Sequence, residues 1–171
     1  RRLDDGEPVD AVVADILGPE GSCSAYLLVA IDVLLSHFDQ GREALVPFLA
    51  CPELLAIDKT RAVHDQVGND LLLFGEKEPS GLVTLADLRE RPSRGTPLSN
   101  ALIAYLQDDE VGNTLRNLLV HAASTLEPYA TYSDFADARF AGRHALNYLD
   151  LSNWKEIKNG QLMYQSPSNE A

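Results

Sequence analysis

The chain has 171 residues, 45% of them apolar, and a formal net charge of −12 at pH 7. A chain of this length and apolar content can bury a core that is stable without disulfides or metal ions. Its large excess of carboxylates repels phosphate backbones, so we expect no binding to DNA or RNA.

The two cysteines, Cys23 and Cys51, are too few for a disulfide framework, and no Cys-x-x-Cys pair is present. We expect both to be small packing residues in apolar helices. No stretch approaches the roughly 18 apolar residues of a membrane span, and no signal peptide is visible. These features favour a reduced, cytoplasmic location away from membranes. The one methionine is Met163, so we expect a fragment of a larger protein.

Apolar residues at helical spacing predict an all-α or nearly all-α fold, a compact bundle or array of about seven to nine helices in a single domain over residues 1–171. Residues 1–7 are expected to be a polar, frayed lead-in, and Pro8 to open the first helix, which Gly18 ends. The next helix is apolar around its whole circumference, so we expect Ala25 to Leu35 to be the most buried segment.

Further short helices are expected in close succession. Gly41 should break the chain before a helix from Glu43 to Ala50, which Pro47 should end or kink. Pro52 should open another piece, and Asp58 should cap a helix that runs through Val67. This arrangement resembles the packing of helical-repeat proteins of the HEAT type, although no fixed period is found.

The second half of the chain begins with residues 68–97, whose glycines and prolines predict an irregular connecting region. Three helices are then expected, with starts near Thr96, Val111 and Ser133 and regularly spaced apolar faces. The expected inner faces are Leu98, Leu102, Tyr105 and Leu106, then Val111, Leu115, Leu118, Leu119, Ala122 and Leu126, then Phe135, Ala138, Gly142, Ala145, Leu146 and Leu149.

Residues 154–165 are expected to form a β-hairpin, because Asn159-Gly160 suits a two-residue type I′ turn. An isolated hairpin is only marginally stable in water, so it must dock on the helices or pair with a strand outside this sequence. We expect Trp154 to anchor it where the last helix ends. The alternation of side chains predicts that Ile157, Leu162 and Tyr164 face the core.

His37 and the doublet His64-Asp65, followed by a distant aspartate, are the residues best suited to hold a metal ion. A helical domain with this order is similar to the HD phosphohydrolases. The resemblance implies that His37, His64 and Asp65 bind a divalent metal, which activates water against a phosphoester. A last ligand would come from Asp134, Asp137 or Asp150. The chain departs from the family pattern beside the doublet, since Arg61-Ala62-Val63 precedes it and Gln66-Val67-Gly68 follows it.

Other polar residues are expected to be structural. Asp32 lies in the apolar helix and must be paired or reach solvent, and we expect a hydrogen bond to Ser36 or to a neighbouring helix end. His121 and His144 are expected at the edge of the core. The segment Gly18 to Ser22 lacks the Gly-Lys-Ser/Thr ending of a phosphate loop, and we expect a helix connection there. No dinucleotide, nucleophile-elbow or zinc-protease motif occurs.

The segments Gly21 to His37 and His144 to Trp154 resemble helical regions of large multidomain bacterial proteins, some of which carry an ATPase domain elsewhere. The leading hypothesis is a non-catalytic protein-interaction or scaffolding module. Its partner would be another protein or other domains of the same chain, with no cofactor and no metal. The alternative hypothesis is a metal-dependent phosphohydrolase that uses His37, His64 and Asp65.

Overall fold

The structure is a computed structural model, and it divides the chain into two compact units. Unit 1 comprises Arg1–Leu45 and Arg61–Pro97, and unit 2 comprises Val46–Thr60 and Leu98–Ala171. The residues that the structure describes are 2–67, 93, 97–108, 110–126 and 137–167.

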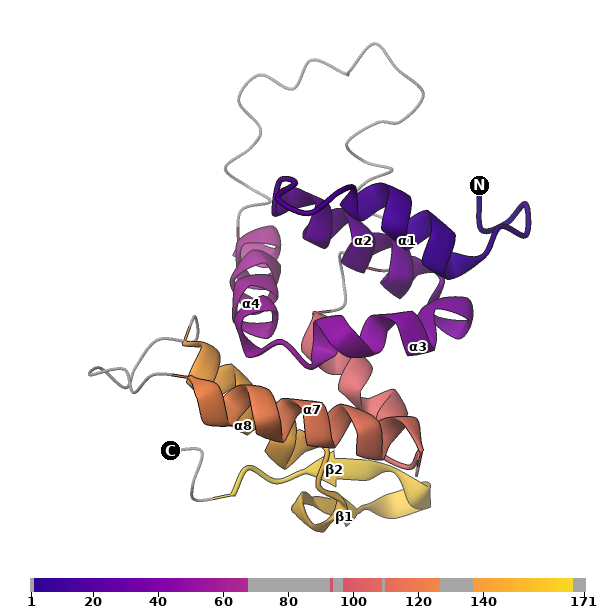
Figure 1. Ribbon diagram of the computed structural model, residues 1–171. Coiled ribbons are helices and arrows are strands. Elements are labelled where there is room, and N and C mark those ends of the chain that lie inside the picture. Colours follow the sequence, from indigo (N-terminus) through magenta and orange to yellow (C-terminus); the bar gives the residue numbers. More distant parts are fainter. Residues whose placement is uncertain (1, 68–92, 94–96, 109, 127–136, 168–171) are drawn as a thin grey trace. The chain divides into compact units, whose positions relative to one another are not determined.

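Helices account for 70% of the described residues, and the described strands form one small hairpin near the C-terminus. The predicted fold class is therefore confirmed. In chain order, the principal elements are α1 (Val9–Leu17), α2 (Ala25–Ser36), α3 (Phe38–Leu49), α4 (Pro52–Val67), the 3-10 helix η2 (Leu98–Tyr105), α7 (Val111–Thr125), α8 (Ala138–Tyr148), and the strands β1 (Trp154–Glu156) and β2 (Leu162–Tyr164) (Figure 1).

In unit 1, α1 and α2 lie side by side (Figure 1). As predicted, α1 begins after Pro8 and ends at Gly18, whose φ of 68° is a left-handed conformation that glycine adopts without strain. The residues before α1 are anchored, in contrast to the predicted frayed lead-in. Leu3 is buried, and Arg2 forms hydrogen bonds with both Glu7 and Asp15.

Gly41 was predicted to break the chain before α3. It lies buried inside α3 instead. A Cβ atom at this position would lie 2.8 Å from Cδ2 of Leu34 and 3.3 Å from the Leu34 carbonyl oxygen. Glycine is required here because α3 approaches α2 closely. Pro47 lies in the last turn of α3, in keeping with the prediction that it would end the helix.

Asp58 was predicted to cap a separate helix, but it lies inside α4, which runs without a break from Pro52. The Asp58 side chain is buried, and its Oδ2 accepts a hydrogen bond of 2.5 Å from the backbone N–H of Leu98. Asp58 therefore caps a helix after all, but the helix is η2, 40 residues further along the chain. The predicted cap of that helix, Thr96, lies outside the described residues.

The core of unit 2 follows the predicted helix faces closely. Of the predicted inner residues, the buried ones are Leu98, Leu102, Tyr105, Leu106, Leu115, Leu119, Gly142, Ala145 and Leu149. Leu118 is exposed, contrary to prediction. Ser133 and Phe135 lie outside the described residues. Helix α8 begins at Ala138 and is capped by Asp137, whose carboxylate accepts the N–H of Arg139 at 2.8 Å.

Removing the Asp58 carboxylate should destabilise the protein. The Asp58→Ala variant leaves the buried N–H of Leu98 without this acceptor, and we expect unfolding to become easier by about 1–3 kcal/mol. Asp58→Asn keeps an acceptor oxygen and should recover part of the loss. Urea unfolding followed by circular dichroism measures both variants. Equal midpoints for wild type and Asp58→Ala would contradict the importance of this bond.

Candidate functional site

Helix α2 is less buried than its sequence predicts. Its buried residues are Ala30, Ile31 and Leu34, whereas Tyr26 and Val29 are each 48% exposed. The prediction that Ala25 to Leu35 would be the most buried segment is therefore wrong. Among the described residues, α2 packs against α1, Leu34 approaches Gly41 of α3, and Asp32 bonds to Ser93.

The exposed side of α2 carries an apolar stripe, which we call the α2 face: Tyr26, Val29 and Val33. These residues are three and four positions apart, so they lie along one side of the helix. Val33 is half-buried. Single exposed apolar residues are ordinary on protein surfaces. A helix that is apolar all round and yet exposed along one side is typical of a binding surface.

The sequence from Leu3 to Gly41, which includes α2, contains no lysine or arginine, and Arg2 and Arg42 flank it. The same 39 positions hold eight carboxylates, namely Asp4, Asp5, Glu7, Asp10, Asp15, Glu20, Asp32 and Asp39. Arg2, just outside this stretch, hydrogen bonds to Glu7 and Asp15, which raises the pKa of its guanidinium and lowers the pKa of Glu7. This end of the chain therefore carries a strongly negative charge.

Asp32, the carboxylate within the apolar helix, is paired as expected. Its partner is Ser93, whose buried hydroxyl donates to Oδ1 of Asp32, and not the predicted Ser36. Arg61 in turn donates to the carbonyl oxygen of Ser93, with an N···O distance of 3.5 Å. The hydrogen bond satisfies a carboxylate that would otherwise be costly in an apolar helix.

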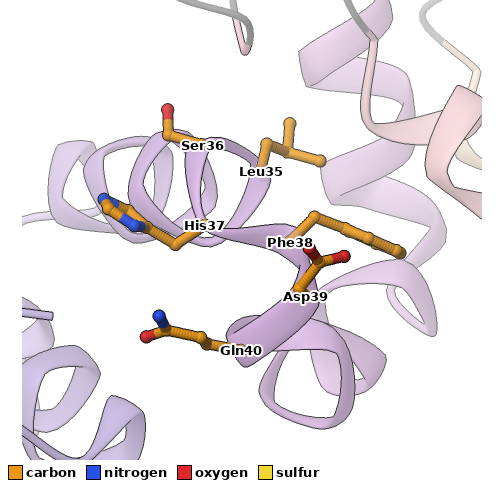
Figure 2. Close-up of a pocket in the computed structure, with 6 residues that line it drawn as sticks. All are labelled: Leu35, Ser36, His37, Phe38, Asp39 and Gln40. Atoms are coloured by element: carbon orange, nitrogen blue, oxygen red, sulfur yellow. The ribbon is translucent and has the colours of Figure 1, made fainter. Parts of the chain in front are cut away.

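His37 lies at the junction of α2 and α3, beside a hollow of about 340 Å³ lined by Leu35, Ser36, His37, Phe38, Asp39 and Gln40. Figure 2 shows the His37 and Phe38 rings pointing away from each other. The Nδ1 atom of His37 lies 3.8 Å from Oδ1 of Asp4. The lining residues are consecutive along the chain, and in Figure 2 their polar groups point in different directions.

The described part of the chain does not test the metal ligands predicted from sequence. His64 and Asp65 lie in α4, but their side chains, like all of Asp134, are outside the described set. Asp137 caps α8. Asp150 accepts the N–H of Ser152 at 2.9 Å, which holds the pKa of Asp150 below its ordinary value.

Within the ranges given above, no three histidine, cysteine, aspartate or glutamate side chains are placed to hold a metal ion. The set His37, His64 and Asp65 stays a prediction from sequence.

An aromatic cluster joins the hairpin to the last helix. Phe140, His144 and Tyr148 follow one another at four-residue spacing along α8, and Trp154 and Tyr164 are a cross-strand pair in the hairpin. The ring centroid of Tyr148 lies 4.7 Å from that of Trp154 and 4.8 Å from that of Tyr164. The rings pack against each other, so this aromatic cluster holds the hairpin against α8.

The expected roles of Trp154 and His144 agree with this geometry. The indole Nε1 of Trp154 donates to the carbonyl oxygen of Tyr148 at 2.9 Å, where the last helix meets the hairpin. Burial in the aromatic cluster raises the pKa of the Tyr148 phenol. His144 is half-buried at the edge of the core, whereas His121 is exposed on α7, contrary to prediction.

The details of the hairpin differ from the sequence prediction. The strands are joined by a longer loop that contains a 3-10 turn at Lys158–Gly160, and the N–H of Ile157 donates to the carbonyl of Gln161 at 2.7 Å. The predicted two-residue type I′ turn is therefore wrong. Ile157 and Leu162 are exposed and do not face the core; of the three residues predicted to do so, only Tyr164 is half-buried.

The two cysteines lie in different environments. Cys23 is exposed in the turn before α2, so it is not the packing residue predicted from sequence. Cys51 is half-buried between α3 and α4, with its Sγ 3.4 Å from Oε2 of Glu53, and burial raises the pKa of its thiol.

Comparison with known proteins adds no assignment. The chain matches no protein-family model, and no match is found among curated proteins or solved structures. Among the helices described, none has the combination of length and apolar character that crossing a bilayer requires. The candidate site must therefore be judged on its own residues, and the α2 face is the feature that packing within the described chain leaves unexplained.

Truncating Trp154 should weaken the docking of the hairpin. Trp154→Ala removes the ring contacts and the hydrogen bond to Tyr148, and we expect a loss of about 2–4 kcal/mol, below the upper end for a fully buried tryptophan. Leu162→Ala, at an exposed position of the same hairpin, should change stability by less than about 0.5 kcal/mol. Denaturant unfolding compares the two. If both variants unfold at the wild-type midpoint, Trp154 is not the anchor.

The cysteines should differ in reactivity. We expect iodoacetamide to alkylate Cys23 well before Cys51 at pH 7.5, because Cys51 is half-buried and its raised pKa keeps its thiolate fraction low. Mass spectrometry of peptides taken at intervals gives the two rates. The difference should disappear in denaturant, and faster alkylation of Cys51 in the folded protein would contradict the assignment.

Proposed function

We propose that this chain is a non-catalytic protein-interaction module and that the α2 face is its binding surface. The observation that supports the proposal is the mismatch between an all-round apolar helix and the exposure of Tyr26 and Val29. Selection for stability alone does not favour apolar residues on the solvent-exposed side of a helix. Selection for a partner that covers the stripe does favour them.

The size of the α2 face indicates what the partner must add. Full burial of an aliphatic or aromatic side chain contributes about 1.5–3 kcal/mol, so covering the remaining exposed area of Tyr26 and Val29 contributes roughly half that for each. Such a sum is too small for a stable complex by itself. We therefore place these residues at the centre of a larger interface, where apolar anchors carry a disproportionate share of the binding energy.

The partner is a separate protein or another domain of the same chain. A cytoplasmic setting fits the two free cysteines, since thiols stay reduced there. The module itself needs no cofactor for this role.

The proposal predicts that partner capture depends on the α2 face. The immobilised protein and its Tyr26→Ser/Val29→Ser variant are exposed to a lysate of the source cells, and the bound proteins are identified by mass spectrometry. We expect at least one protein that wild type retains and the variant loses, and that then binds wild type in purified form. A matched variant, Val63→Ser/Val120→Ser, removes two equally exposed apolar residues elsewhere and should retain it. Identical capture by wild type and the α2 variant contradicts the proposal.

A further inference from the structure

We infer that the ligand of the α2 face is a cationic amphipathic helix on the partner. The inference rests on the proposed function and specifies its partner class. Three features carry it: the apolar stripe of Tyr26 and Val29, the helical backbone that presents it, and exposed carboxylates on the neighbouring segments.

The helical backbone of α2 determines the type of partner. Its N–H and C=O groups are used within the helix, so α2 offers side chains and no strand edge to pair with. The stripe from Tyr26 to Val33 runs along the helix for about 10 Å, or two turns. A helix with apolar residues at i, i+3 and i+7 matches a stripe of this length and direction.

The charge around α2 determines the partner's polar face. Glu20 lies in the turn before α2 and Asp39 in the first turn of α3 after it, and both are exposed. Asp10 is exposed on α1, which packs alongside α2. No lysine or arginine occurs from Leu3 to Gly41, and Arg42, three residues after Asp39 in α3, is half-buried. These carboxylates would attract lysines or arginines that flank an apolar stripe on the partner and so steer its approach.

The same charge argues against a second copy of this chain as the occupant. Two copies facing each other through α2 would bring the acidic stretch of Leu3 to Gly41 against itself, and like charges across an interface are unfavourable. A partner with an acidic polar face is disfavoured for the same reason. The occupant that satisfies both the stripe and the charge is therefore apolar on one side and basic on the other.

Two synthetic peptides test the inference. Both carry the same leucine stripe at helical spacing, but one has lysine and the other glutamate at every polar position. Fluorescence anisotropy measures their binding to the full chain at 50 mM and 500 mM salt. We expect the lysine peptide to bind, with affinity at least tenfold weaker at high salt, and the glutamate peptide not to bind.

Variants separate the apolar and the electrostatic contributions. Tyr26→Ser/Val29→Ser should weaken binding of the lysine peptide at least tenfold, and Asp10→Asn/Glu20→Gln/Asp39→Asn about three- to tenfold. Glu110→Gln/Glu156→Gln, which neutralises exposed carboxylates in unit 2, should leave the affinity unchanged. Circular dichroism confirms that each variant is folded.

Several outcomes overturn the inference. Equal binding of the two peptides would show that charge has no role. If Tyr26→Ser/Val29→Ser leaves the affinity for the lysine peptide unchanged, the binding is only non-specific electrostatic attraction. If the lysine peptide fails to bind while capture of a natural partner still depends on Tyr26 and Val29, the inference fails and the proposed function stands. If natural capture is indifferent to those two residues, the proposed function itself fails.

Discussion

The hydrogen bond from the Leu98 amide to the Asp58 carboxylate is the contact on which unit 2 depends. Asp58 and Leu98 are both buried, so neither group can exchange its partner for water without cost. The bond fixes the start of η2 against α4 and thereby places Leu102 and Tyr105 in the core. It also joins two segments that are distant in the chain, since residues 46–60 and the residues from 98 onward belong to one unit.

In unit 1, one side of helix α2 is buried in the core and another side is exposed to solvent. The inner side of α2, with Ala30, Ile31 and Leu34, packs in the described core, and Gly41 allows α3 to come close to it. The outer side, with Tyr26 and Val29, is exposed on a helix that packs in this core. A preformed surface of this kind loses little conformational entropy when a partner binds.

Sequence periodicity predicted the elements in which one side is apolar and the other polar. The faces of η2, α7 and α8 were largely predictable for this reason, and so was the contact of Trp154 with the last helix. In α2 the pattern is apolar in every direction, so it carries no information on which side faces solvent. The partners of Asp58 and Asp32 lie 40 and 61 residues away, beyond the reach of local spacing. The prediction for Gly41 was wrong because glycine is favoured both where a helix ends and where two helices approach closely.

The order of the two units along the chain has a consequence for synthesis. Val46–Thr60 belongs to unit 2, but the rest of that unit begins only at Leu98, after the second segment of unit 1. At roughly 5–20 residues per second, the ribosome needs several seconds to supply it. During that time Phe48, Leu49 and Leu55, all buried in the finished protein, have no core to enter. The nascent chain therefore passes through a stage in which these three apolar side chains are accessible to chaperones.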